Sequence, residues 1–252
     1  GSNLSKIYLD KLNASNQVKT LKNIVQSEIG RERLPMLIID CNPRELKTNF
    51  SKISARIAAI NGFSIFGKNH TFALTPDLKI DHSKVKLFLN KYKDKPFLVF
   101  GFTSLIFLNF IKKLDNKIKK NDFVNGIIIH GGGWKKLENL NISNLKFREL
   151  LKKNIGAKNI INYYGLVEQT GSIFLECNKC RNFIKKNFSE VIIRDKDFES
   201  QKKNKRGIVQ LISIIPTSYA GHILLTEDEG MIIDNKKCTK CEKKNGTKFK
   251  IY

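Results

Sequence analysis

Long apolar runs are absent from this chain of 252 residues. No run approaches the roughly 20 residues that a membrane-spanning helix needs, and no signal-peptide pattern is visible. Cysteine is scarce, at five residues, which excludes a dense disulfide framework and makes the reducing cytoplasm the expected compartment. The chain still contains 41% hydrophobic residues, including 17 Phe, enough to bury a core as one large or two small domains.

Acidic residues are also few, 23 against 46 Lys and Arg, so the formal net charge is +23. Only 8 of these 46 cations are Arg, the residue whose fork geometry suits phosphates and bases. The Lys residues spread along the whole chain, and neither zinc-finger histidines nor a single basic stripe accompanies them. Nucleic acid is therefore not the favoured partner, while the charge still favours an acidic protein or an anionic substrate.

Four of the five cysteines form two pairs with the same Cys-x2-Cys spacing. Cys177 and Cys180 are one pair, and Cys238 and Cys241 are the other. Two such pairs complete the four-thiolate shell of structural Zn²⁺, which leaves no open position for a substrate. The alternatives are a chance pairing of the spacings or ordinary buried thiols. Cys41 follows an apolar run and is expected to be a buried thiol with a raised pKa.

Apolar strands alternate with helices over the first part of the chain, which predicts a mostly parallel α/β sheet with flanking helices. The expected strands are 34–39, 96–100, 126–129 and 159–164, and the expected helices are 17–30, 52–60, 103–114 and 147–154.

The pattern changes near residue 170 to short strands separated by charged turns, which indicates a smaller β-rich subdomain. The expected strands there are 172–176, 191–195, 207–215 and 222–226, with a solvated loop at 195–206. We therefore predict an α/β part over 1–170 and a β-rich subdomain over 171–252, stapled by the four-cysteine metal site.

Three glycines follow the expected strand 126–129, in the segment His130-Gly131-Gly132-Gly133-Trp134. Glycines after a strand let backbone groups approach a flat ligand closely. The segment matches neither the P-loop nor the dinucleotide fingerprint, and a glycine turn before a helix would have the same sequence.

Two carboxylates stand near other strand ends. Tyr164 ends an expected strand, Gly165 follows it, and Glu168 stands three residues further on. A loop carboxylate of this kind can hold Mg²⁺ against phosphates, although a buried Tyr and a surface Glu would have the same pattern. Asp228 lies after a strand and before an expected turn at Gly230, where a carboxylate can accept hydrogen bonds from both ribose hydroxyls.

Taken together and in this order, these segments resemble the adenylate-forming superfamily of acyl and aryl ligases. They are most similar to the branch that holds phenylacetate–CoA ligases and the acyl-protein synthetases of bacterial luminescence. The resemblance covers nearly the whole chain and includes 34–40, 100–103 and Gly221-His222. It implies that a carboxylate attacks the α-phosphorus of ATP and that a thiol then takes the acyl group. The acceptor would be CoA, a carrier protein or a protein cysteine, the last serving a reductase.

The resemblance also implies roles for single residues. It implies that Gly131, Gly132 and Gly133 line the adenine and that Tyr164, with Gly165, packs on it. It also implies that Asp228 binds the ribose hydroxyls and that Glu168 is catalytic and holds Mg²⁺. The acid pocket is expected to draw on Phe100, Phe102, His130 and Trp134.

The chain departs from the family pattern in two respects. Val167 stands where the commonest motif has Thr. The phosphate loop is expected before residue 5 and a C-terminal lobe after residue 252, so we expect the central part of a larger enzyme that binds nucleotide weakly and does not turn over alone. The acid stays open among fatty, aromatic and sugar-linked acids. The alternatives are a zinc-stapled nucleic-acid-binding module and a non-catalytic scaffold derived from such a ligase.

Overall fold

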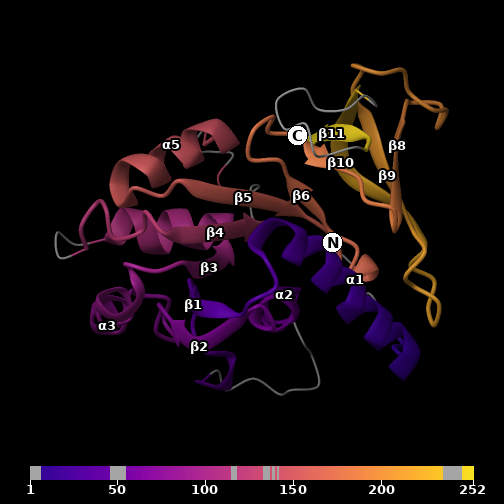
Figure 1. Cartoon of the computed structure of the whole chain (residues 1–252). Coiled ribbons are helices and arrows are strands. Elements are labelled where there is room, and N and C mark those ends of the chain that lie inside the picture. The colour runs from indigo at the N-terminus through magenta and orange to yellow at the C-terminus, as the bar shows by residue number, and fades with distance from the viewer. Residues whose placement is uncertain are drawn as a thin grey trace. The chain divides into compact units, whose positions relative to one another are not determined.

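The computed structural model describes residues 7–45, 55–114, 118–132, 137, 140, 142–234 and 246–252. The chain divides into two compact units (Figure 1). The first comprises Gly1–Gly30 with Tyr163–Tyr252, and the second comprises Arg31–Asn162. This division differs from the linear one that the sequence predicts, because the N-terminal helix belongs with the C-terminal part of the chain.

The second unit is built on strands in the order β2-β1-β3-β4-β5. Their bounds are Leu34–Ile38 for β1, Gly67–Phe72 for β2, Phe97–Phe102 for β3, Gly126–Gly131 for β4 and Asn159–Tyr164 for β5, which runs across the boundary between the units. β1 pairs in parallel with β2 and β3, and β3 with β4. Continuous apolar runs form β1, β3 and β4 because parallel strands are buried on both faces.

Helices cover both faces of these parallel strands. Phe100 stacks on Phe63 of α2 (Ala55–Ser64), with ring centroids 4.5 Å apart. Phe97 meets Phe88 of α3 (His82–Tyr92) edge-on, at 5.5 Å. Successive strand residues point to opposite faces, so residues 97 and 100 of β3 place α3 and α2 on opposite sides. The remaining long helix is α5 (Asn144–Ile155), which ends at Gly156 in the left-handed conformation.

The helix predicted at 103–114 is present but irregular. It begins as α4 (Thr103–Leu105), continues as a π-helix over Ile106–Phe110 and ends as a 3₁₀-helix over Ile111–Lys113. The strands and the α-helix that the sequence analysis does not include are β2, β7, β11 and α3. β2 escapes a search for apolar runs because it is an edge strand with exposed polar residues at 68–70.

The first unit combines a long helix with antiparallel strands in the order β6-β7-β11-β10-β9-β8. Their bounds are α1 (Lys11–Ile29), β6 (Phe174–Glu176), β7 (Phe183–Ile184), β8 (Ser189–Arg194), β9 (Gly207–Ser213), β10 (Ile223–Asp234) and β11 (Lys248–Ile251). The end of β5 pairs with β6. The apolar core of this unit gathers around Phe174, Phe183 and Phe249. The predicted mixed α/β fold is confirmed. Of the helices that the structure describes, none is long and apolar enough to cross a membrane.

α1 begins six residues before the predicted helix because polar residues line its buried side. Asp10 caps its first turn by accepting a hydrogen bond from the backbone N–H of Asn13, at 2.6 Å. The buried Asn13 Oδ1 accepts from the backbone N–H of Thr217, at 2.8 Å, and Gln17 Nε2 donates to the Tyr219 hydroxyl, at 3.2 Å. The helix is therefore held to the loop after β9 by polar contacts that an apolar-periodicity search does not detect.

Gly171 lets α1 approach the backbone closely. Its φ is +91°, and a Cβ there would lie 2.6 Å from the backbone oxygen of Gln17 and 2.7 Å from its Cα. Neither atom can move without shifting the helix, so this position requires glycine for both its conformation and its space.

Replacing Gly171 with Ala should destabilise the protein more than replacing Gly30 with Ala. Gly30 also has positive φ, at +85°, but a Cβ there would meet nothing within 4 Å. Gly30→Ala therefore costs only backbone strain, about 1–3 kcal/mol. Gly171→Ala costs a similar strain and, in addition, an overpacking penalty of about 1–3 kcal/mol. Urea unfolding of both variants measures the difference, and equal losses would contradict the close approach.

Candidate functional site

Tyr164 and Asp228 meet in the first unit although they lie on strands far apart in the sequence. The Tyr164 hydroxyl, at the end of β5, donates a hydrogen bond to Asp228 Oδ2 on β10, at 2.7 Å. The Tyr164 ring lies 6.3 Å from Phe174 and 6.0 Å from Phe183, centroid to centroid. Burial, and secondarily the charge of Asp228, raise the pKa of Tyr164 far above its usual range, so this hydroxyl is a permanent donor.

Asp228 lies inside a strand, and the predicted turn at Gly230 is wrong. β10 continues to Asp234, and Gly230 pairs with β9 on one side and β11 on the other. Glycine is needed there for space, since a Cβ would lie 2.6 Å from Val209 Cγ2. The turn-like sequence therefore marks close packing rather than a reversal of the chain.

Asp228 lies at an irregularity in β10. The pairing register with β9 shifts between Leu225 and Glu229, and such shifts leave backbone groups without ladder partners. The Thr226 hydroxyl compensates by donating to the carbonyl of Val209, at 2.9 Å, and by accepting from the backbone N–H of Asp228, at 3.1 Å. Thr226 thus fixes the backbone from which the Asp228 side chain projects.

Glu168 lies on a short 3₁₀-helix, η5 (Val167–Gln169), and is partly buried. The next residue, Gln169, is fully buried and donates through Nε2 to the carbonyl of Gly221, at 2.9 Å. Burial raises the pKa of Tyr219, and the negative charge of Glu168 adds to the increase. The carboxylate of Glu168 therefore lies within electrostatic range of Tyr219.

Gly165 is required for packing, because a Cβ would lie 2.8 Å from Ile173 Cγ2. The supporting contacts of this unit were missed by sequence reasoning, namely Thr226, Gln169 and Tyr219. The only signal that could have found them was a polar side chain beside a proposed site residue, as Gln169 stands beside Glu168.

In the second unit, the glycines after β4 lie against an aromatic of the predicted acid pocket. Gly131 pairs with Phe102 in the β3–β4 register. Gly132 has a φ of +61°, and a Cβ there would lie 3.1 Å from Phe102 Cδ1. Gly133 and Trp134 lie outside the described residues. The structure therefore brings two of the three glycines beside Phe102.

His130 and Phe100 are packed inside the second unit. Phe100 is buried between Phe63 and Phe102. His130 is fully buried, its Nδ1 lies 3.0 Å from the Thr103 hydroxyl, and its ring lies 4.8 Å from that of Phe147. Burial, followed by the nearby charge of Arg148, lowers the pKa of His130 to about 3, so the ring is neutral at physiological pH.

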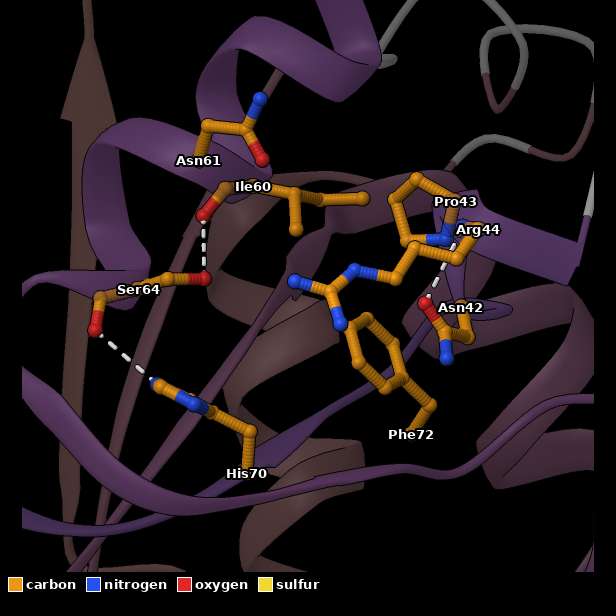
Figure 2. A pocket seen from close by; sticks show the side chains of 8 residues that line it. All are labelled: Asn42, Pro43, Arg44, Ile60, Asn61, Ser64, His70 and Phe72. Carbon is orange, nitrogen blue, oxygen red and sulfur yellow. Dashed lines mark hydrogen bonds between the residues drawn. The ribbon is translucent and has the colours of Figure 1, made fainter.

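A separate cavity of about 400 Å³ lies in the second unit between α2, β2 and the 3₁₀-helix η1 (Pro43–Glu45) (Figure 2). The Arg44 side chain extends into it between Ile60 and Phe72. None of the predicted acid-pocket residues lines this cavity; its lining residues are Asn42, Pro43, Arg44, Ile60, Asn61, Ser64, His70 and Phe72.

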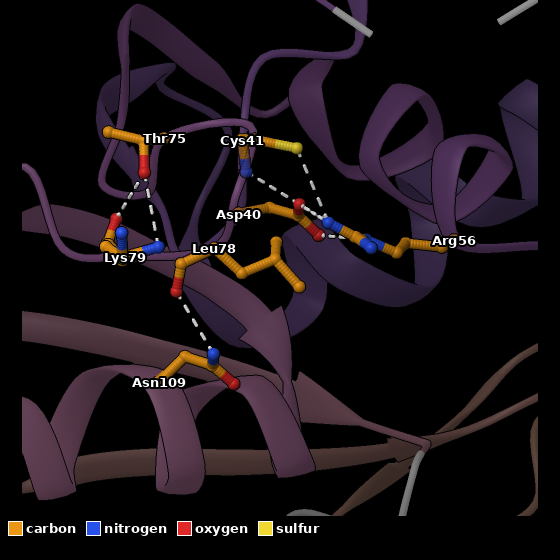
Figure 3. A network of polar contacts seen from close by, with 7 residues as sticks. All are labelled: Asp40, Cys41, Arg56, Thr75, Leu78, Lys79 and Asn109. Atoms are coloured by element: carbon orange, nitrogen blue, oxygen red, sulfur yellow. Dashed lines mark hydrogen bonds and ion pairs between the residues drawn. The ribbon is translucent and has the colours of Figure 1, made fainter.

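An ion pair between the buried Asp40 and the half-buried Arg56 follows the end of β1, as Figure 3 shows. Arg56 Nε donates to Asp40 Oδ2, at 2.7 Å, and a second guanidinium nitrogen contacts Asp40 Oδ1. That nitrogen also lies 3.5 Å from Cys41 Sγ. Burial, and then the charge of Asp40, raise the pKa of Cys41. The prediction of a buried thiol with a raised pKa is therefore confirmed.

Cys177 and Cys180 lie in the turn between β6 and β7. The Cys177 carbonyl accepts from the backbone N–H of Arg181, and the Cys177 N–H donates to the carbonyl of Asn182, both at 2.9 Å. Cys238 and Cys241 lie outside the described residues. Within the part of the chain that the structure describes, no three or more His, Cys, Asp or Glu gather as metal ligands.

His130 should make the protein less stable as the pH is lowered. Its folded pKa of about 3 lies below the ordinary 6.5, so between these values the unfolded chain binds a proton that the folded chain excludes. Stability is then complete above pH 6.5 and declines below it, by roughly 2 kcal/mol down to pH 5. Urea unfolding at pH 7 and pH 5 should show this decline in the parent and a smaller one in His130→Asn. Equal declines would contradict the burial of an uncharged ring.

Comparison with solved structures identifies the fold. A 2-hydroxyisobutyryl-CoA ligase in complex with 2-HIB-AMP and CoA has a TM-score of 0.68 at 10% identity, over 92% of this chain and 47% of that one. ATP-bound MatB from Rhodopseudomonas palustris has a TM-score of 0.61 at 10% identity, over 90% of this chain and 42% of that one. The amide bond synthetase McbA from Marinactinospora thermotolerans has a TM-score of 0.58 at 12% identity, over 93% of this chain and 44% of that one. At these identities the likeness shows the fold alone, and the chain spans less than half the length of these structures.

Comparison of sequences identifies the family. No curated protein matches the chain. The family model described as "Acyl-protein synthetase, LuxE" matches residues 2–252, which is nearly the whole sequence. The chain therefore belongs to the LuxE acyl-protein synthetase family.

Proposed function

We propose that this protein activates a carboxylic acid with ATP as an acyl-adenylate and passes the acyl group to a thiol. The observation that carries the proposal is the hydrogen bond between Tyr164 and Asp228. The family resemblance assigns these residues to the base and the ribose of one nucleotide, and 64 residues separate them in the sequence. Their direct contact in the folded unit supports a shared ligand.

The residues present suit a nucleotide. Asp228 offers a carboxylate that accepts hydrogen bonds, and Tyr164 offers an aromatic ring beside it. Gly131 and Gly132 are proposed to line the adenine on the family resemblance; neither carries a side chain, and Gly132 is exposed. We assign Mg²⁺ to Glu168, where the ion would offset charge on the phosphates. ATP would supply an α-phosphorus that the carboxylate attacks with loss of pyrophosphate, and the thiol would then attack the acyl carbon with loss of AMP.

The acid is proposed to be fatty or aryl, because the predicted pocket residues are apolar or uncharged. Phe102 is partly exposed and would supply aromatic surface, Phe100 packs beneath it, and His130 is neutral. Trp134 stays in this proposal on the family resemblance alone.

The acceptor thiol is proposed to come from another molecule: CoA, a carrier protein, or a cysteine of a partner such as a reductase. Within this chain, Cys41 is an unsuitable acceptor, because it is buried and its pKa is raised.

A structural zinc ion is proposed to join the two cysteine pairs. Gly246 is five residues after Cys241, and the neighbouring Thr247 accepts a hydrogen bond from the backbone N–H of Lys185, at 2.9 Å. Lys185 is itself five residues after Cys180. Because five extended residues reach at most about 18 Å, this placement lets the second pair approach the first. Thiolate ligands also favour a reducing, cytoplasmic location.

The first test is ATP–pyrophosphate exchange by the full-length gene product across fatty, aryl and hydroxy acids. Exchange that depends on one acid class is the expected result. If the folded protein shows no exchange with any of these acids, the non-catalytic scaffold is favoured. Steeply salt-dependent binding to DNA or RNA would favour the nucleic-acid alternative.

Asp228→Ala and Glu168→Ala should abolish nucleotide binding without unfolding the protein, because each removes a ligand-binding carboxylate. Isothermal titration with Mg-ATP checks this, with circular dichroism as the folding control. Glu227→Ala is the matched variant: its side chain is exposed beside Asp228 on β10, and its affinity should stay that of the parent. Unchanged affinity in both site variants would count against the assigned site.

The purified protein should contain about one zinc ion per chain. Cys177→Ser and Cys238→Ser should each lose most of the zinc and unfold at a lower midpoint temperature, since the ion would cross-link distant segments. Cys41→Ser should keep the zinc. Elemental analysis and thermal unfolding check this, and a metal-free, chelator-insensitive parent would exclude the zinc site.

A further inference from the structure

We propose that the Tyr164 hydroxyl makes the nucleotide site selective for ribonucleotides by fixing the orientation of the Asp228 carboxylate. The inference rests on the proposed function. It gives Tyr164 a second role, because its ring is assigned to the base while its hydroxyl acts through Asp228. Tyr164 is therefore a positioning residue for ribose recognition.

The geometry around Asp228 leaves its carboxylate dependent on Tyr164. Thr226 holds the backbone N–H of Asp228, and Tyr164 holds Oδ2 of the side chain. Among the described residues, no other donor bonds to the Asp228 side chain. Removing the Tyr164 hydroxyl would thus leave the backbone in place and free the carboxylate to rotate about its side-chain torsions.

The direction of the Tyr164 hydroxyl is itself set by packing. Phe174 and Phe183 contact the ring, and both belong to the apolar core of the first unit. The raised pKa of Tyr164 keeps the proton on the hydroxyl. The phenol is therefore always the donor in its hydrogen bond to Asp228.

A carboxylate in a fixed orientation distinguishes ribose from deoxyribose. Two carboxylate oxygens provide about four acceptor sites, so Oδ2 can hold the phenol and still accept a ribose hydroxyl while Oδ1 accepts the other. A 2′-deoxynucleotide lacks one of these donors and leaves a carboxylate oxygen unpaired. A carboxylate that can rotate loses much of this discrimination, because it can turn its second oxygen to solvent.

The test is the ratio of the affinities for Mg-ATP and Mg-2′-deoxyATP, measured by titration on the full chain. The parent should prefer ATP roughly tenfold, as expected for one hydrogen bond to a charged group. Tyr164→Phe keeps the ring and should reduce this preference to about threefold or less, mainly by weakening ATP binding. Tyr163→Phe removes a neighbouring phenol on the opposite face of β5 and should leave the ratio unchanged.

An Asp228→Glu background tests whether Tyr164 acts through the carboxylate, because Glu keeps a carboxylate but moves it by one methylene relative to the Tyr164 hydroxyl. There, Tyr164→Phe should change the ratio much less than it does in the parent, whereas the same change in both backgrounds would overturn the mechanism. If Tyr164→Phe does not fold, Thr226→Val provides the second test: it loosens the backbone of Asp228 and should lower the same ratio.

The outcomes separate this inference from the proposed function. A parent that binds neither nucleotide overturns both. A parent that binds both nucleotides equally, or a Tyr164→Phe variant that keeps the full preference, overturns this inference alone and leaves nucleotide activation standing.

Discussion

The arrangement of the first unit depends on the hydrogen bond that the buried side-chain amide of Gln169 donates to the carbonyl of Gly221. A buried amide N–H is costly unless it is hydrogen-bonded, and Gln169 Nε2 donates to the carbonyl of Gly221 in the connection between β9 and β10. The turn that carries Glu168 is thereby fixed to the strand that carries Asp228. Asn13 and Gln17 of α1 hold the same connection from the other side. The relative positions of the two carboxylates thus depend on neutral polar residues.

Much of the fold follows from the sequence where apolar residues alone decide it. The runs at 34–39, 126–129 and 159–164 became β1, β4 and β5 with bounds within two residues, because strands buried on both faces must be apolar. α1 was predicted too short because Asn13 and Gln17 are buried polar residues whose partners are distant in the sequence. β2 was missed because an edge strand needs no apolar run, and the turn predicted at Gly230 failed because close packing and chain reversal both select glycine.

The candidate site is less predictable than the fold, because its residues are specified by contacts rather than by periodicity. The family resemblance names Tyr164 and Asp228, but it does not specify the hydrogen bond between them. That bond joins β5 to β10 across 64 positions of the sequence, and no local pattern predicts it. Cys41 was easier to interpret, because a thiol at the end of an apolar strand is buried whatever its neighbours are.

The register shift in β10 also restricts how this strand can change in length. Between the pairs Leu225–Gln210 and Glu229–Ile208, β10 has three residues where β9 has one. The surplus of two is even, so side chains alternate in the same phase on both sides of the shift, and Thr226 and Asp228 share the inner face. Loss or gain of a single residue there would reverse that alternation and move the side chains of one half of the strand to the opposite face of the sheet. Viable insertions and deletions at this point should therefore come in pairs.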